Sequence, residues 1–162
     1  MIEIGKKATA FNLLNQDEKE VKLEDFKGKY LILYFYPKDN TSGCTKEAID
    51  FSEIKEKLNK INAEVVGVSP DTVASHKKFI AKHDLKITLL SDREKKTMKD
   101  YGAWGPKKVC GKECEGVIRS TVLISPKGII EDIWKNVRVR TKRKTGEVKH
   151  AETVLEKLSS KE

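Results

Sequence analysis

Cys44 is the residue whose surroundings are best suited to chemistry. It lies between an apolar run at residues 30–36, which predicts a buried strand ended by Pro37, and a helical pattern at residues 45–59. The start of a helix carries unpaired N–H groups and the positive end of the helix dipole, which together stabilise a thiolate. A cysteine at such a place is a nucleophile at neutral pH. The simpler alternative is a small, buried apolar residue.

Two neighbours favour the reactive interpretation. Thr41 lies three residues before Cys44, so its hydroxyl can turn toward the sulfur, and Pro37 shields the thiol from bulk water. The spacing of Pro37, Thr41 and Cys44 resembles the active-site pattern of the peroxiredoxins, which is Pro, three residues, Thr or Ser, two residues, Cys. The longer stretch of residues 34–48 looks like the bacterioferritin-comigratory, or PrxQ, branch of that family. Residues 23–29 are also similar to the segment that precedes the family's core strand.

The resemblance implies a thiol peroxidase that reduces hydrogen peroxide and organic hydroperoxides. Cys44 would attack the peroxide as a thiolate and become a sulfenic acid, while Thr41 would hydrogen-bond the peroxide. Arg119 would be the active-site cation, because residues 116–124 resemble the strand that delivers the family's arginine; a surface charge at a strand edge is the alternative. Glu47 either supports this arginine or faces solvent. A dithiol such as thioredoxin would reduce the oxidised enzyme again. The resemblance implies no metal, haem or flavin cofactor.

The reduction of the sulfenic acid is left open by the sequence. In two-cysteine members of the PrxQ branch, a resolving cysteine lies five positions after the first cysteine or in the second helix. Here Ile49 and Ile80 hold those positions, which leaves Cys110 and Cys114, in a predicted loop at residues 105–116. Four interpretations of these two cysteines compete. They would resolve the sulfenic acid, form their own disulfide, bind zinc with two further ligands, or stay reduced in a one-cysteine enzyme. We favour resolution.

Length and composition fit a globular protein. The 162 residues, 38% hydrophobic and 36% charged, predict one domain over residues 1–162. No apolar run approaches the roughly 20 residues of a membrane span, and the first residues do not resemble a secretory signal. The three cysteines, an odd number, argue against a secreted disulfide framework, so we expect a cytoplasmic protein. The sequence does not choose between a monomer and a homodimer.

The net charge of +8 raises the question of a polyanionic partner. The basic segment at residues 135–149 has no aromatic residues between its charges for stacking on bases, so a nucleic-acid role is disfavoured. We expect it to extend the preceding strand as a basic edge that serves solubility.

Two other functions are less consistent with these residues. A non-enzymatic binding protein would not need the set of Thr41, Cys44 and Arg119. A disulfide oxidoreductase would need a cysteine at position 41.

The predicted elements alternate between strands and helices. Apolar and alternating segments predict an N-terminal hairpin at residues 11–23, strands at 30–36, 63–69, 87–90, 119–125 and 129–134, and helices at 45–59, 72–83, 93–101 and 147–158. Crossovers require parallel neighbours and the final short turn requires an antiparallel pair. We therefore expect an α/β chain with a mixed central sheet and helices on both faces, a thioredoxin-like fold with an N-terminal hairpin. His76 and His83 are expected at the surface or at a helix end.

Overall fold

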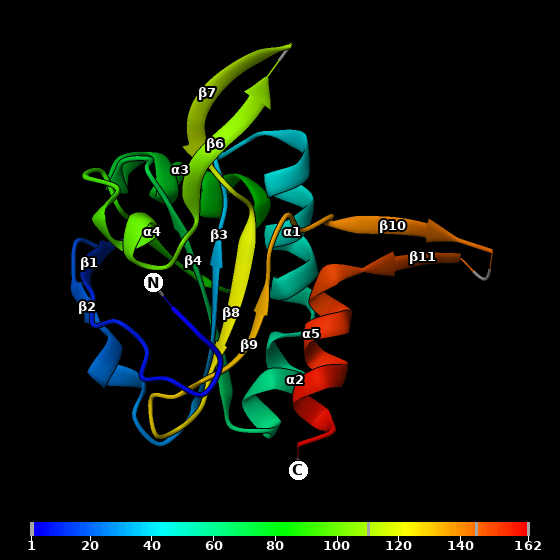
Figure 1. The fold of residues 1–162 in the computed structure, drawn as a ribbon. Coiled ribbons are helices and arrows are strands. Elements are labelled where there is room, and N and C mark those ends of the chain that lie inside the picture. Colours follow the sequence, from blue (N-terminus) through cyan, green and yellow to red (C-terminus); the bar gives the residue numbers. More distant parts are fainter. Residues whose placement is uncertain (1, 110, 145, 162) are drawn as a thin grey trace.

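A computed structural model describes residues 2–109, 111–144 and 146–161 (Figure 1). A seven-stranded sheet, in the order β2-β1-β5-β4-β3-β8-β9, forms its centre. These strands are β1 Asn12–Asn15, β2 Glu20–Lys22, β3 Tyr30–Phe35, β4 Ala63–Ser69, β5 Thr88–Ser91, β8 Ser120–Ile124 and β9 Ile130–Trp134.

Strand β3 lies in the interior of the sheet because it is apolar on both sides. It pairs in parallel with β4 and antiparallel with β8. Ile32 and Tyr34 on one face, and Leu31 and Leu33 on the other, are all fully buried, as expected for a strand covered on both faces. The predicted mixed sheet is confirmed. The predicted N-terminal hairpin forms from β1 and β2 and joins the sheet through β5.

Helices cover both faces of the sheet, as predicted. They are η1 Leu23–Phe26, α1 Ser42–Glu53, α2 Lys55–Lys60, α3 Val73–His83, α4 Lys96–Asp100 and α5 His150–Ser159. On one face, α1, α3 and α5 contribute Phe51, Phe79 and Val154 to a single apolar cluster. On the other face, η1 and α4 contribute Phe26 and Met98 to a second cluster. Within the described residues, no helix has the length and apolar character needed to cross a membrane.

The helix predicted at residues 45–59 is two helices in the structure. It begins at Ser42 and breaks at Ile54, the residue that joins α1 to α2 and that is buried in the core. No glycine or proline marks the break, so the residue types gave no signal of it. The earlier start places Cys44 inside the first turn of α1.

Two antiparallel hairpins stand outside the main sheet and project from it (Figure 1). Strands β6 Trp104–Val109 and β7 Lys112–Val117 replace the predicted loop at residues 105–116. Strands β10 Arg140–Arg143 and β11 Gly146–Lys149 replace the predicted extension of the strand before residue 135. Both hairpins are rich in lysine and glutamate, which are depleted in strands, so their composition hid them. Asn136, with a left-handed φ of 51°, turns the chain away from β9.

Candidate active site

The loop between β3 and α1 delivers Cys44. Asn40 adopts a left-handed φ of 62°, which asparagine tolerates better than most residues, and the extended Thr41 is the N-cap of α1. The N–H of Thr45 donates to the Thr41 carbonyl at 2.9 Å and closes the first helical turn. Cys44 lies in that turn and is only 1% exposed. The helix N-terminus therefore acts on a sulfur that water barely reaches.

Arg119 brings a cation against this sulfur. It lies between β7 and β8, and its Nη2 donates to Cys44 Sγ at 3.1 Å. The guanidinium lies close to the backbone of the first helical turn, since a Cβ at Gly43 would come into van der Waals contact with Arg119 Nη2 at 3.4 Å. A charge-assisted hydrogen bond from a permanently charged group is stronger than one between neutral groups, so it holds the guanidinium against the sulfur.

Glu47 binds the other side of the same guanidinium. Its Oε1 accepts from Arg119 Nη1 at 2.6 Å, and its side chain is 1% exposed. Burial raises the pKa of Glu47 to about 7, and the charge of Arg119 opposes that rise. Burial by itself lowers the pKa of Arg119, but Glu47 and Cys44 outweigh it and the pKa is raised. The guanidinium is thus held between two groups that favour its charge.

The alternative left open for Glu47, exposure to solvent, is wrong. Glu47 follows Cys44 by three residues, and side chains at this spacing lie on the same side of a helix. This spacing is the signal that could have assigned Glu47 to the arginine from the sequence alone.

Thr41 and Pro37 flank the cysteine in the same loop. The Thr41 hydroxyl donates to the Lys38 carbonyl at 2.9 Å. Its one hydrogen therefore does not point at the sulfur of Cys44, which differs from our expectation. Its oxygen keeps lone pairs that can accept a hydrogen bond. Pro37 is half-buried and directly follows Tyr36, whose N–H donates to the Val68 carbonyl as the final bond of this strand region.

The two candidate resolving cysteines belong to the β6–β7 hairpin. Cys110 lies outside the described residues. Cys114 lies in β7 opposite Lys107, exposed to solvent, and both Cys44 and Cys114 are free thiols. Because β7 runs directly into Arg119, the hairpin rises from the edge of the candidate site (Figure 1).

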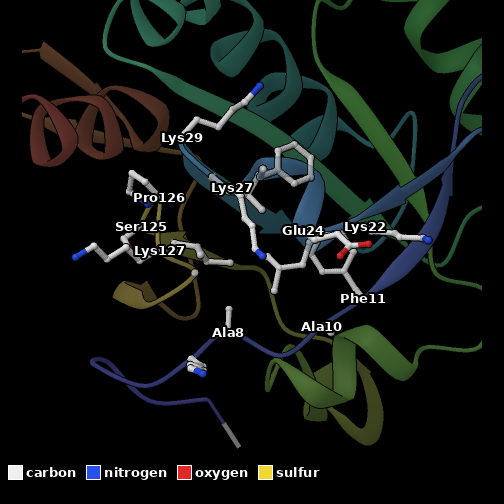
Figure 2. A pocket seen from close by; sticks show the side chains of 16 residues that line it. Ala8, Ala10, Phe11, Lys22, Glu24, Lys27, Lys29, Ser125, Pro126 and Lys127 are labelled. Atoms are coloured by element: carbon white, nitrogen blue, oxygen red, sulfur yellow. The ribbon is translucent and has the colours of Figure 1, made fainter.

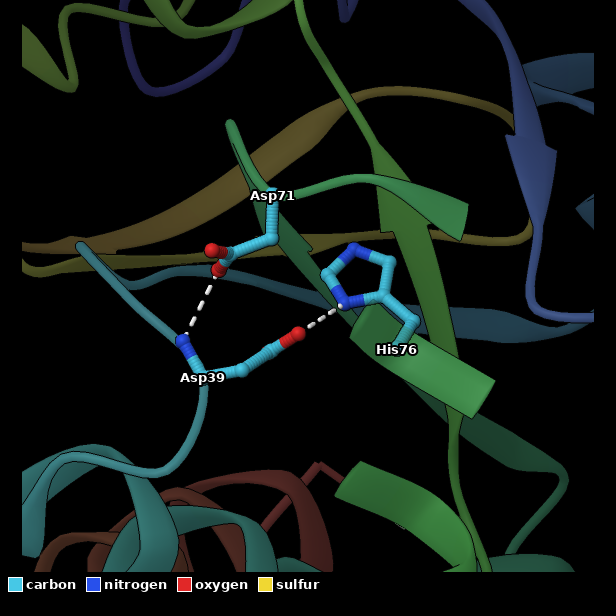
Figure 3. A group of neighbouring side chains, drawn as sticks. All are labelled: Asp39, Asp71 and His76. Atoms are coloured by element: carbon cyan, nitrogen blue, oxygen red, sulfur yellow. Dashed lines mark hydrogen bonds and ion pairs between the residues drawn. The ribbon is translucent and has the colours of Figure 1, made fainter. Parts of the chain in front are cut away.

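The prediction that His76 lies at the surface or at a helix end is wrong. His76 is completely buried, and its Nδ1 lies 2.8 Å from Asp39 Oδ2 (Figure 3). No local pattern predicts this contact, because the two residues are 37 positions apart. His83 ends α3 as expected, half-buried and with its ring edge-on to Phe79.

A cavity of about 540 Å³ lies away from the candidate site (Figure 2). Phe11, Phe26, Leu31 and Ile124 are its buried apolar residues, and its lining also includes several lysines. Leu31 is at the beginning of β3, whereas Cys44 follows the other end of that strand. The lining contains neither Cys44 nor Arg119, so this cavity is not part of the candidate site.

Comparisons with known proteins identify the family of the chain. Residues 4–133 match the AhpC/TSA family. The chain is 46% identical over 139 residues to peroxiredoxin Bcp of Bacillus subtilis (strain 168), a match that covers 86% of this chain and 88% of the relative.

Solved structures of similar proteins cover nearly the whole chain. The crystal structure of a mutant of PrxQ from Xylella fastidiosa has a TM-score of 0.89 and 33% identity, covering 99% of this chain and 98% of that one. The bacterioferritin comigratory protein of Xanthomonas campestris has a TM-score of 0.83 and 34% identity, covering 93% and 91%. The predicted thioredoxin-like fold is thereby confirmed. The chain belongs to the AhpC/TSA family and is a thiol-dependent peroxidase of the Bcp and PrxQ type.

Proposed function

We propose that Cys44 is the residue that the peroxide oxidises. Its thiolate attacks the terminal oxygen of a hydroperoxide, the O–O bond breaks, and the sulfur is oxidised to a sulfenic acid while the peroxide is reduced. The leaving oxygen takes up a proton and departs as water or as an alcohol. The observation that carries the proposal is the 3.1 Å contact between Arg119 Nη2 and Cys44 Sγ. A cation fixed there stabilises the thiolate and the negative charge that develops on the leaving oxygen.

Thr41 and Pro37 complete the proposed site. Because the Thr41 hydroxyl donates to the Lys38 carbonyl, its oxygen is available to accept a hydrogen bond from the O–H of the incoming peroxide. Arg119 as donor and Thr41 as acceptor would orient the peroxide for attack by the sulfur. Pro37 shields the thiol from bulk water.

We infer that the substrates are hydrogen peroxide and organic hydroperoxides, and that a dithiol such as thioredoxin is the reductant. The alkyl peroxide reduction activity of the Xanthomonas relative supports the organic class.

We infer that the protein works in the cytoplasm, because a reducing compartment would keep Cys44 and Cys114 as thiols. The groups of the proposed site come from one chain, so a monomer suffices, and a homodimer would hold two copies. We take residues 1–162 as one domain, which the continuous sheet from β2 to β9 supports.

Cys114 is the resolving residue that we favour over Cys110. Its thiolate would attack the sulfenic sulfur of Cys44, forming a disulfide and releasing water, and an external dithiol would then reduce the disulfide. Its exposure on β7, the strand that leads to Arg119, supports this role.

Mass spectrometry after one equivalent of hydrogen peroxide tests the proposal. The wild-type protein, Cys44→Ser and Cys114→Ser are each oxidised in the presence of a sulfenic-acid trap, and the modified residues are mapped. We expect a disulfide between Cys44 and Cys114 in the wild type, and a trapped sulfenic acid at Cys44 in Cys114→Ser. An unmodified Cys44 in the wild type would refute the assignment of the nucleophile. A sulfenic acid at Cys44 beside a free Cys114 in the wild type would refute only the assignment of the resolving residue.

A further inference from the structure

A buried polar network lies directly beside the loop that carries Thr41. Asp39 is at its centre (Figure 3). Asp39 Oδ1 accepts from the Tyr36 hydroxyl at 2.6 Å, and its Oδ2 accepts from the Ser75 hydroxyl at 2.8 Å and lies 2.8 Å from His76 Nδ1. The Asp39 N–H donates to Asp71 Oδ2, also at 2.8 Å. The backbone and the side chain of one loop residue are thus both tied to the segment from Asp71 to His76.

The contacts of His76 indicate where the hydrogens of its ring lie. The ring nitrogen Nε2 lies 2.9 Å from the Leu90 carbonyl, which can only accept, so Nε2 carries a hydrogen. The other nitrogen, Nδ1, faces Asp39, and a hydrogen must lie between the two groups to join them. Asp39 and His76 therefore share one proton, either as an ion pair or as two neutral groups. With side chains 2% and 0% exposed, the pair is shielded from solvent.

Asp39, Asp71 and His76 also lie close enough together to suggest a metal site, since their ligand atoms fall within 4.8 Å of one another. Their hydrogen bonds speak against it. Both oxygens of Asp39 accept hydrogen bonds, and Asp71 Oδ2 accepts from the Asp39 N–H and from the Ser69 hydroxyl at 2.7 Å. A metal would have to displace these donors from a buried site, so the network is better explained by what it holds in place.

What the network holds is the turn before α1. Lys38 directly precedes Asp39, and its carbonyl accepts the hydrogen of the Thr41 hydroxyl at 2.9 Å. Asn40, between Asp39 and Thr41, has a left-handed φ of 62°, a conformation that asparagine tolerates and that forms this turn. Anchoring Asp39 therefore fixes the Lys38 carbonyl, and that carbonyl decides where the oxygen of Thr41 can accept a hydrogen bond.

We propose that Asp39 and His76 are positioning residues that aim the hydroxyl of Thr41 at the peroxide. The pair ties α3 to the turn at residues 38–41, whereas the sulfur is contacted by Arg119, which binds Glu47 through a separate hydrogen bond. This proposal rests on the role of Thr41 and Cys44 proposed above. It predicts that loss of the buried pair slows the reaction of Cys44 with peroxide. The reaction of the same thiol with a reagent that needs no orienting acceptor should keep its rate.

A double-mutant cycle between Asp39→Asn and Thr41→Val tests the coupling. The measured quantity is the second-order rate constant for oxidation of Cys44 by hydrogen peroxide in a stopped-flow instrument. We expect Asp39→Asn and His76→Gln each to lower it about tenfold, and Asp39→Asn to cause no further loss once Thr41 is valine. Rate losses that multiply in the double variant would show that Asp39 acts independently of Thr41, and would overturn the proposal.

Alkylation by iodoacetamide separates positioning from general damage. In Asp39→Asn and His76→Gln, the alkylation rate of Cys44 should stay within about twofold of the wild-type rate, as it should in the control Lys77→Gln, at an exposed neighbour of His76 on α3. Alkylation that falls in parallel with peroxide oxidation would show that the network acts on the sulfur itself and overturn the proposal. Thermal unfolding measures any loss of folding. If the wild type failed to react with peroxide at Cys44, the proposed function would fail instead, so the two failures are distinguishable.

Discussion

Glu47 and Asp50 lie three residues apart on α1, both are buried, and each binds an arginine from a different part of the chain. Arg119 donates to Glu47 at 2.6 Å, and Arg140 donates to Asp50 at 2.7 Å and 3.1 Å. The first arginine also contacts Cys44. The second comes from β10 and holds the basic hairpin against the helix. Two neighbouring turns of α1 are thus fixed by two arginines, one at the candidate site and one beyond it.

Replacement of Arg119 should slow peroxide reduction more than loss of charge alone explains. Arg119→Lys keeps the positive charge, but one ammonium group cannot reproduce the two directed bonds to Glu47 and Cys44. We expect the rate constant for oxidation of Cys44 by hydrogen peroxide to fall about 100-fold in Arg119→Gln and somewhat less in Arg119→Lys. Arg138→Gln, at an exposed arginine, is the control. A rate in Arg119→Gln equal to that of the control would remove Arg119 from the proposed mechanism.

Glu47 should make folding stability fall as the pH rises. Its folded pKa of about 7 lies above the ordinary value of 4.5, so between these pH values the folded state binds a proton that the unfolded state releases. Glu47→Gln removes this dependence. From pH 4.5 to pH 8, the variant should gain stability relative to the wild type, by on the order of 3 kcal/mol at most. Chemical denaturation at several pH values measures the difference, with Glu56→Gln on the exposed side of α2 as the control; parallel curves would contradict the raised pKa.

His150 should act in the opposite direction. Burial, assisted by the charge of Arg119, lowers the pKa of His150 to about 4, below its ordinary value of 6.5. The unfolded state therefore takes up a proton that the folded state refuses, and stability falls as the pH drops from 6.5 to 4. His150→Gln keeps a polar group for the 2.8 Å contact with Thr121 and cannot titrate. Between pH 7 and pH 4 the wild type should lose on the order of 3 kcal/mol relative to this variant, and an equal loss in both proteins would refute the assignment.

Removal of Arg140 should destabilise the fold although the residue lies on a projecting hairpin. The Asp50 side chain is 1% exposed, and without Arg140 its remaining cation is Lys149, at 3.9 Å. Arg140→Ala should cost about 2 kcal/mol, less than the usual penalty for breaking a buried pair, because Arg140 is 27% exposed and Lys149 remains. Arg143→Ala, at an exposed arginine of the same strand, should change stability by less than about 0.5 kcal/mol. Urea denaturation of the two variants compares them directly, and equal stabilities would show that the Asp50 contact contributes nothing.

The sequence was most informative where the signal is local. The apolar run at residues 30–36, the proline that follows it and the helical pattern after Cys44 together predict the central strand, the loop and the helix. Arg119 was reachable only through the resemblance of its strand, since no spacing rule connects it to Cys44 across 75 residues.

The contacts that were missed join residues far apart in the chain. Asp39 with His76 and Asp50 with Arg140 are separated by 37 and 90 positions, and neither pair has a local pattern. A polar or basic residue whose partner is unknown is expected to face solvent, so the sequence predicts a surface position for His76 and a solubility role for the basic segment. The two extra hairpins were missed for a different reason, because their side chains are poor strand formers that no core selects.

The burial of Cys44 sorts its reaction partners by size. At 1% exposure, the sulfur is accessible only to a small molecule such as a peroxide, but Cys114 must bring its own sulfur to about 2 Å to form the proposed disulfide. The second reaction therefore requires the first turn of α1 to open. Arg140 pins the helix at Asp50, so the opening stays confined to the residues before that point. Under the proposed mechanism, the first turn of α1 must be closed when peroxide oxidises Cys44 and open when the sulfenic acid is converted into a disulfide. The rate of that opening therefore sets an upper limit on turnover.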